Sequence, residues 1–171
     1  EEVQAAAAGA LGAINDSQAI EPLISALADD DDVVRGQAVK ALAEIGLPAS
    51  GALITALERD DIRIKQGAAE ALGEIKDARA IEPLIAAFQS QSREMRQASV
   101  TALLKINKSS AVEPFIQILR EENATDDLRA YAARALGEMG DARANEALLH
   151  ALASSSESNV RMNAARALKE I

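Results

Sequence analysis

The feature that most constrains the fold of this chain is an internal repeat of about 31 residues. The segment AIEPLI at residues 19–24 returns at 80–85 and, as AVEPFI, at 111–116. A second string, R-x-x-A-x-x-A-L, alternates with these copies, and its closing leucines are spaced by 31, 30, 31, 33 and 32 residues. These leucines are Leu11, Leu42, Leu72, Leu103, Leu136 and Leu168. A fixed period of this size is typical of a solenoid, in which each repeat contacts mainly its neighbours.

The composition indicates that the repeats are helical. Hydrophobic residues make up 49% of the chain, yet aromatic residues only 2%. The abundant Ala and Leu have high helix propensity, and small Ala side chains let helices approach closely. The alternating pattern of a β-strand is absent. We therefore predict an all-α fold, a right-handed αα-solenoid of helix pairs with about 31 residues in each repeat.

Each repeat is expected to hold two helices, which we call the A helix and the B helix. The A helix contains the EP motif, and its apolar residues fall at i, i+3, i+4 and i+7, as in Ile20, Leu23, Ile24 and Leu27. Proline is tolerated in a first helical turn, where we expect Pro22, Pro83 and Pro114. The B helix has a similar stripe, which in the first complete repeat consists of Val34, Ala38, Ala41, Leu42 and Ile45.

Polar residues mark the expected helix ends. Side chains suited to cap a helix N-terminus precede the B helices at Asp31, Asp61, Ser92 and Thr125, and the A helices at Asp16, Asp77 and Asp141. Gly46 and Gly140, with Asn15 and Asn107 at the equivalent places, are predicted to end B helices in a left-handed conformation.

These signals divide the chain into a leading B helix at 3–14 and helix pairs that start near residues 17, 49, 78, 109 and 142. We expect residues 1–171 to form a single solenoid. Terminal repeats normally carry a polar outer face, but the first helix is almost entirely Ala and Gly on its outer side. We therefore expect this chain to be part of a longer array.

The repeat resembles a known family. The stretches IKQGAAEALGEIKDARAIEPLI at 64–85 and LRAYAARALGEMGDARANEALL at 128–149 are similar to HEAT-like repeats of the phycobilisome lyase type. The resemblance covers essentially the whole chain. It implies a HEAT-like solenoid, and it is compatible with bilin lyases as well as with scaffolding subunits. The chain departs from the pattern at Gly51-Ala52, which replaces EP, at Leu47-Pro48, and in a lengthened turn at 121–126.

Charge and cysteine content exclude several function classes. The net charge is −9, from 18 basic and 27 acidic residues, whereas nucleic-acid binding needs clustered Lys and Arg. No apolar run approaches the roughly 20 residues that a membrane span requires. The chain has no cysteine, which excludes disulfides, thiolate metal sites and a thiol nucleophile. We expect neither nucleic acid nor membrane as a partner, and a cytoplasmic location.

No motif in the chain points to catalysis. A Gly-rich phosphate loop and a G-x-S-x-G motif are absent. His150 is the only histidine and cannot form a multi-histidine metal site. The run Asp29 to Asp32 lacks the ligand spacing of a calcium loop, and an acidic turn before a helix N-terminus explains it better. We therefore predict no catalytic residue, no metal site and no cofactor.

A basic residue recurs at one position of every complete B helix. The resemblance implies that it forms a ladder with turn acids, and our main interpretation is that it bonds carbonyls or carboxylates between neighbouring repeats. The alternative is an anion-binding row. This basic ladder consists of Arg35, Lys65, Arg96, Arg129 and Arg161.

The exposed side of the B helices is the expected binding surface, because its residues vary among repeats while the core residues do not. In HEAT-like families this layer is concave. We predict that Tyr131 and Arg134 anchor a partner, since Tyr and Arg are enriched at binding hot spots; the alternative is a Tyr131 ring that Arg134 merely covers. The other candidates are Gln37, Lys40, Arg63, Glu70, Thr101, Lys105, Asn163 and Arg166, and the same face includes Glu74, Glu94 and Ala98.

Two functions remain open at this point. The first is a non-catalytic scaffold that binds a protein partner on the concave B-helix face. The second, implied by the resemblance alone, is a subunit of a bilin lyase or isomerase. A bilin pocket should offer aromatic contacts, but the B-helix face has a single Tyr, and Phe88 and Phe115 belong to the predicted A-helix core. The scaffold is therefore preferred, and the identity of its partner is not encoded in any recognisable motif.

Overall fold

A computed structural model describes residues 17–121 and 123–171 of the chain. The leading helix predicted at 3–14 lies outside the described residues, as do its predicted end residue Asn15 and the predicted cap Asp16 of the next helix. All regular structure in the described part is helical, as predicted. The described residues form two compact units, one that ends at Ile106 and one that begins at Asn107.

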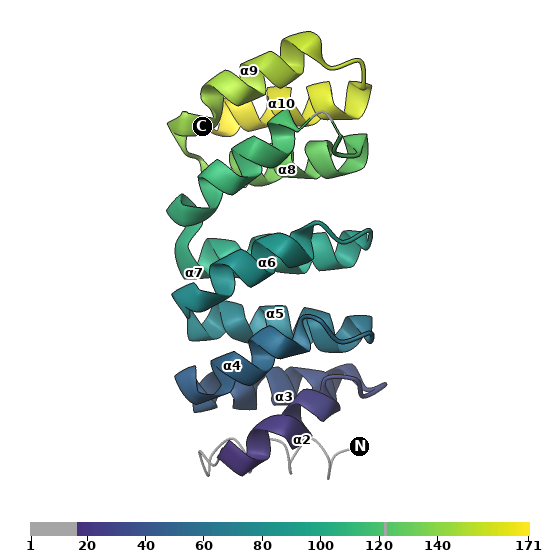
Figure 1. Ribbon diagram of the computed structural model, residues 1–171, viewed down its shortest axis with the longest axis vertical. Coiled ribbons are helices and arrows are strands. Elements are labelled where there is room, and N and C mark those ends of the chain that lie inside the picture. Colours follow the sequence, from purple (N-terminus) through teal and green to yellow (C-terminus); the bar gives the residue numbers. More distant parts are fainter. Residues whose placement is uncertain (1–16, 122) are drawn as a thin grey trace. The chain divides into compact units, whose positions relative to one another are not determined.

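The first unit consists of three helix pairs. A 3-10 turn, η1 (Ser17–Ala19), leads into α2 (Ile20–Ala26), which packs against α3 (Asp32–Ile45). The second pair is α4 (Leu47–Ala56) with α5 (Ile62–Ile75). The third consists of η2 (Ala78–Ala80), α6 (Ile81–Phe88) and the first part of α7 (Arg93–Arg120). Within this unit α2, α4 and α6 form one layer, and α3, α5 and the start of α7 form the other (Figure 1).

The second unit repeats the same arrangement. The remainder of α7 is the A helix of a pair that α8 (Asp126–Met139) completes. A further 3-10 turn, η3 (Ala142–Ala144), leads into α9 (Asn145–Ser154), and α10 (Ser158–Glu170) follows. α10 packs against both α8 and α9.

The apolar stripes read from the sequence form the cores of these units. Leu23, Leu42, Leu72, Leu103 and Leu136 are each at most 1% exposed. The two phenylalanines of the chain, Phe88 and Phe115, are fully buried within A helices. Each Å² of apolar surface that is removed from water stabilises the fold by about 25 cal/mol. The repeated leucines and alanines therefore contribute strongly to the stacking of the repeats.

The polar caps predicted at the helix starts are present where the structure describes them. Asp31 and Asp61 accept hydrogen bonds from the backbone N–H groups of Val33 and Arg63, each at 2.8 Å. The Thr125 hydroxyl accepts from Leu128 N–H at 3.3 Å. Asp77 and Asp141 cap the 3-10 turns η2 and η3 in the same way. Each cap satisfies one of the free N–H groups of a helix start.

The prediction of left-handed helix ends is confirmed in full at one of the three described positions. Gly140 ends α8 with φ 62° and ψ 34°, which is left-handed. Gly46 ends α3 with a positive φ of 74°, but its ψ of −140° lies outside the left-handed helical region. Asn107 instead has an extended backbone, with φ −166°, and its side chain accepts hydrogen bonds from the N–H groups of Ser109 and Ser110. Asn107 therefore caps the following A helix rather than ending the preceding B helix, and it produces the kink inside α7.

Two further details differ from expectation. Pro114 lies inside the second part of α7 and not in a first turn, so the helix lacks one backbone hydrogen bond there. Lys76 occupies the left-handed position after α5, with φ 59° and ψ 36°. The left-handed position therefore recurs in the repeats, but the residue type that fills it does not.

Candidate binding surface

The B helices present their predicted outer positions to solvent in both units. The residues proposed for partner binding are exposed or half-buried throughout, and none belongs to the core. In the first unit these are Gln37, Lys40, Arg63, Glu70, Thr101 and Lys105, and in the second they are Tyr131, Arg134, Asn163 and Arg166.

A groove with a volume of about 520 Å³ lies between α5 and the first part of α7. Glu70, Glu94, Ala98, Thr101 and Lys105, all predicted for the exposed B-helix face, contribute to its walls. The remaining lining residues are Gln66, Arg93, Gln97 and Ala102. α5 and α7 approach closely at Ala102, one of the lining residues: a β-carbon on Gly73 would lie 3.0 Å from the Ala102 α-carbon.

The groove combines charges of both signs with neutral hydrogen-bonding groups. Lys105 donates to the Glu74 carboxylate at 2.7 Å, and this hydrogen bond lowers the pKa of Glu74. The Thr101 hydroxyl donates to the backbone oxygen of Gln97 at 2.9 Å. The Glu70 carboxylate makes no hydrogen bond or ion pair with any described residue. The groove therefore holds at least one carboxylate that is free to receive a donor from a ligand.

The Tyr131 ring lies beneath Arg134 in the second unit. The guanidinium carbon of Arg134 is 5.1 Å from the ring centroid, and its Nε is 3.2 Å from the Glu138 carboxylate. Tyr131 is half-buried. The cation–π contact considered as an alternative in the sequence is thus present in the free protein, and a partner would meet the two side chains already ordered.

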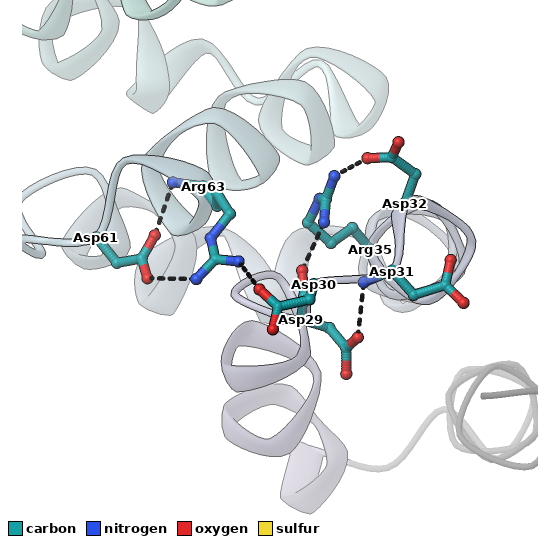
Figure 2. A network of polar contacts seen from close by, with 7 residues as sticks. All are labelled: Asp29, Asp30, Asp31, Asp32, Arg35, Asp61 and Arg63. Carbon is teal, nitrogen blue, oxygen red and sulfur yellow. Dashed lines mark hydrogen bonds and ion pairs between the residues drawn. The ribbon is translucent and has the colours of Figure 1, made fainter.

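The acidic run at 29–32 is part of a polar network at the first A–B turn (Figure 2). Asp31 caps α3, and Asp29 accepts a hydrogen bond from the Asp31 N–H at 2.9 Å. Asp32 pairs with Arg35, and Asp30 accepts from Arg63 of the next repeat at 2.6 Å. Each of the four carboxylates therefore has a partner within the protein.

The same network engages Arg63, whose side chain remains 38% exposed. Its guanidinium spans Asp30 of one repeat and Asp61 of its own (Figure 2), and these hydrogen bonds raise its pKa. The pKa of Asp61 is lowered, chiefly because its carboxylate accepts the backbone N–H of Arg63. Arg63 joins two repeats, although the sequence analysis placed it among the partner-binding residues.

Four members of the basic ladder donate hydrogen bonds to backbone oxygens that precede their own B helix. Arg35 donates to Asp29, Arg96 to Ser90 and Gln91, and Arg161 to Ser155 and Ser156. Arg129 donates to Leu119 at 3.2 Å. These bonds stay within one repeat, whereas we expected them to join neighbours. The side chain of Lys65, the fifth member, has no hydrogen bond or ion pair to any described residue.

Besides Arg63–Asp30 and Lys105–Glu74, further polar contacts join neighbouring repeats through residues that the sequence had not singled out. Arg59 donates to Glu21 at 2.6 Å, and Arg143 donates to the backbone oxygen of Ser109 at 2.9 Å. Arg143 also pairs with Asp141, as Arg79 does with Asp77. The sequence signal was the recurrence of Asp-Ala-Arg-Ala at 77–80 and 141–144, which fixes an arginine next to each A-helix cap.

Other candidate chemistry is sparse in the part of the chain that the structure describes. Residues 17–121 and 123–171 contain no cluster of three or more His, Asp, Glu or Cys side chains suited to a metal ion. His150 is exposed and lies 3.3 Å from the Ser154 hydroxyl. Within the same ranges no helix has both the length and the apolar character to cross a bilayer.

Comparisons with known proteins agree with this arrangement of helices. HEAT repeats match residues 1–61, 50–126 and 112–171, which together span the chain. No curated protein matches it. The complex of CpcE and CpcF of phycocyanin lyase from Nostoc sp. PCC7120 is similar in structure, with a TM-score of 0.67 and 22% identity over 90% of this chain and 99% of that one.

An engineered protein is also similar, with a TM-score of 0.52 and 24% identity over 99% of this chain and 90% of the other. At these identities the two structures show the fold alone. The predicted resemblance to HEAT-like repeats is confirmed, and the chain belongs to the family of HEAT repeat proteins.

Proposed function

We propose that this chain is a scaffold that binds a polypeptide partner along its B helices, with the groove between α5 and α7 as the principal site. The groove carries this proposal, because it lies on the helix face whose residues differ from repeat to repeat and is not filled by the stack. Its volume of about 520 Å³ is in the range of sites that bury a small ligand or a few side chains.

The lining favours a peptide segment of mixed character. Gln66 and Gln97 carry amides that can both donate to and accept from a peptide backbone. The Glu70 carboxylate is free to accept from a basic side chain, and Arg93 contributes a cation to the lining. Ala98 and Ala102 form small, apolar parts of the wall. A strongly charged polymer of either sign would meet repulsion here, and a segment with both charges would not.

Capture of proteins from an extract of the source organism tests this proposal. The variant Ala98→Arg should fill the groove with a long side chain, and Glu82→Arg, on the exposed face of α6 in the other layer, is the matched control. Circular dichroism should confirm that both variants remain helical. We expect a protein retained by the wild type and by Glu82→Arg to be lost by Ala98→Arg; equal retention by all three would refute the groove as the site.

The second unit offers a further anchor at Tyr131 and Arg134. We propose that these two residues contact the same class of partner, since Tyr and Arg supply large contact areas at hot spots and are already stacked on each other. Their test is the affinity of Tyr131→Ala for a partner found by capture. An unchanged affinity would remove Tyr131 from the binding surface.

A role in bilin attachment is the alternative function. Its support is the fold shared with the CpcE and CpcF complex. Both phenylalanines are buried in the A layer, so the B-helix face offers bilin rings little aromatic contact. Mixing the protein with phycocyanobilin and recording the visible spectrum separates the two functions. A shifted, saturable absorption band would favour the bilin role over the scaffold.

A further inference from the structure

Lys65 is an exception in the basic ladder. The arginines at 35, 96 and 161 each donate to the backbone oxygen six residues earlier, which belongs to the A–B turn of the same repeat. The corresponding oxygen for Lys65 is that of Arg59, but the Lys65 side chain makes no hydrogen bond or ion pair with any residue that the structure describes. Lys65 is half-buried, and its ammonium has three donors without a partner among the described residues.

A pocket opens at this position on the side opposite the B-helix groove. It has a volume of about 510 Å³ and lies between the helix pair α4–α5 and the next pair, α6–α7. Lys65 contributes its cation, while Ile54, Leu57 and Met95 contribute apolar surface. Glu58, Gln89 and Ser90 complete the polar part of the wall. A free cation thus lies beside an apolar cavity that the packing of the first unit leaves open.

We propose that this pocket binds a small monocarboxylic acid with an apolar chain, whose carboxylate accepts from Lys65 and whose chain lies against Ile54, Leu57 and Met95. A carboxylate matches the ammonium in charge and as a hydrogen-bond acceptor. A single negative charge fits better than several, because Glu58 in the pocket and Asp60 and Asp61 in the adjoining turn would repel a polyanion. The proposal is independent of partner binding on the B helices.

The three methionines of the chain allow a direct test by NMR of methyl-labelled protein. Met95 is 1% exposed and lines the pocket, whereas Met139 and Met162, which are 1% and 43% exposed, belong to the second unit and do not line it. We expect sodium octanoate to shift the Met95 methyl signal saturably and to leave Met139 and Met162 in place. Octanamide has the same chain without the charge and should bind at least about tenfold more weakly.

Two variants separate a defined site from general charge attraction. Lys65→Met removes the cation and should weaken octanoate binding about tenfold or more. Lys65→Arg keeps the charge but lets the guanidinium reach the turn oxygens that the other ladder arginines use, so it should also weaken binding. Circular dichroism should confirm that both variants fold.

Three results would overturn the proposal. If octanoate shifted the methyl signal of the exposed Met162 as strongly as that of Met95, its binding would be nonspecific. Equal affinities for octanoate and octanamide would mean that the apolar chain alone drives binding and that Lys65 does not contact the carboxylate. Wild-type affinity in Lys65→Met would show the same.

Discussion

Gly137 of α8 lies so close to Ala167 of α10 that a β-carbon on the glycine would fall 2.8 Å from the Ala167 α-carbon. Real β-carbons do not approach a backbone atom this closely. The hydrogen side chain of Gly137 is therefore what allows these two B helices to pack at their observed separation. Gly73 and Ala102 have the same relationship in the first unit, with a corresponding distance of 3.0 Å.

The first prediction concerns this close approach. Gly137→Ala should destabilise the second unit, because the added methyl must push α10 away. Such overpacking costs about 1–3 kcal/mol, whereas alanine gains roughly 1 kcal/mol over glycine in helix propensity. Gly36, an exposed residue inside α3 with open space around it, is the matched control. Gly36→Ala should stabilise the protein, so chemical denaturation should give changes of opposite sign. Stabilisation by both substitutions would contradict the packing argument.

The second prediction concerns the left-handed residues that follow two B helices. Lys76 (φ 59°, ψ 36°) and Gly140 (φ 62°, ψ 34°) have nearly the same backbone conformation. A residue with a side chain is strained there by about 1 kcal/mol. Lys76→Gly should therefore stabilise the protein by up to about 1 kcal/mol, and Gly140→Lys should destabilise it by a similar amount. Thermal unfolding measures both, and changes of the same sign in the two variants would refute the explanation.

The helix pairs could be predicted from the sequence because the same pattern of apolar and capping residues recurs in the repeats. The apolar positions recur in register, so that Leu42, Leu72 and Leu103 are buried in turn. The caps could be predicted for the same reason, since Asp31 and Asp61 precede equivalent helices and accept equivalent N–H groups. When several repeats have the same residue type at the same position, the prediction for that position is more certain than one from a single repeat.

The single-copy features were harder to predict. The alignment of Asn107 with Gly46 and Gly140 predicts a left-handed helix end. Its side-chain oxygen instead accepts hydrogen bonds from two N–H groups at the start of the next helix. The helical position of Arg63 predicts a half-exposed side chain, as the structure has it, but it does not predict the ion pairs of its guanidinium with Asp30 and Asp61. Helical periodicity fixes where a side chain begins, whereas its charged end is placed by tertiary contacts that the periodicity does not contain.

The groove between α5 and α7 was only partly foreseeable. The sequence identifies Glu70, Thr101 and Lys105 as outward-facing, and the structure places all three in its lining. It could not reveal that two B helices leave a hollow there, because this depends on the separation that Gly73 and Ala102 permit. The pocket at Lys65 depends in the same way on contacts among four helices.

The third prediction concerns the pH dependence of stability. Hydrogen bonds from the Arg79 guanidinium, together with its backbone N–H, lower the pKa of the buried Asp77 from 3.8 to about 2. A carboxyl whose pKa is lower in the folded state stabilises the fold above its unfolded pKa, and this stability is lost as the pH falls toward the folded pKa. Asp77→Asn keeps a capping oxygen but removes the charge.

We therefore expect Asp77→Asn to melt a few degrees below the wild type at neutral pH. The difference should shrink as the pH falls from about 4 to about 2, where the wild-type carboxyl also becomes neutral. Thermal melts across this range provide the measurement. A difference that stays constant with pH would mean that the charge of Asp77 makes no contribution.

The last prediction compares two positions of the basic ladder. Arg96 is only 5% exposed and donates to the backbone oxygens of Ser90 and Gln91 at 3.0 and 2.9 Å. Arg96→Met should cost about 3 kcal/mol, because two backbone oxygens of the turn lose the charged donor that the buried Arg96 supplies. Lys65→Met should change the free energy of unfolding by no more than about 0.5 kcal/mol, since Lys65 has no such bonds to lose.

Urea denaturation of the two methionine variants provides the comparison, with Arg96→Lys as an intermediate that keeps the charge and loses the fork of the guanidinium. We expect the order of stability to be Lys65→Met, then Arg96→Lys, then Arg96→Met. Equal losses at positions 65 and 96 would mean that Lys65 supports its turn as the arginines do. In that case its ammonium would not be available to a carboxylate ligand.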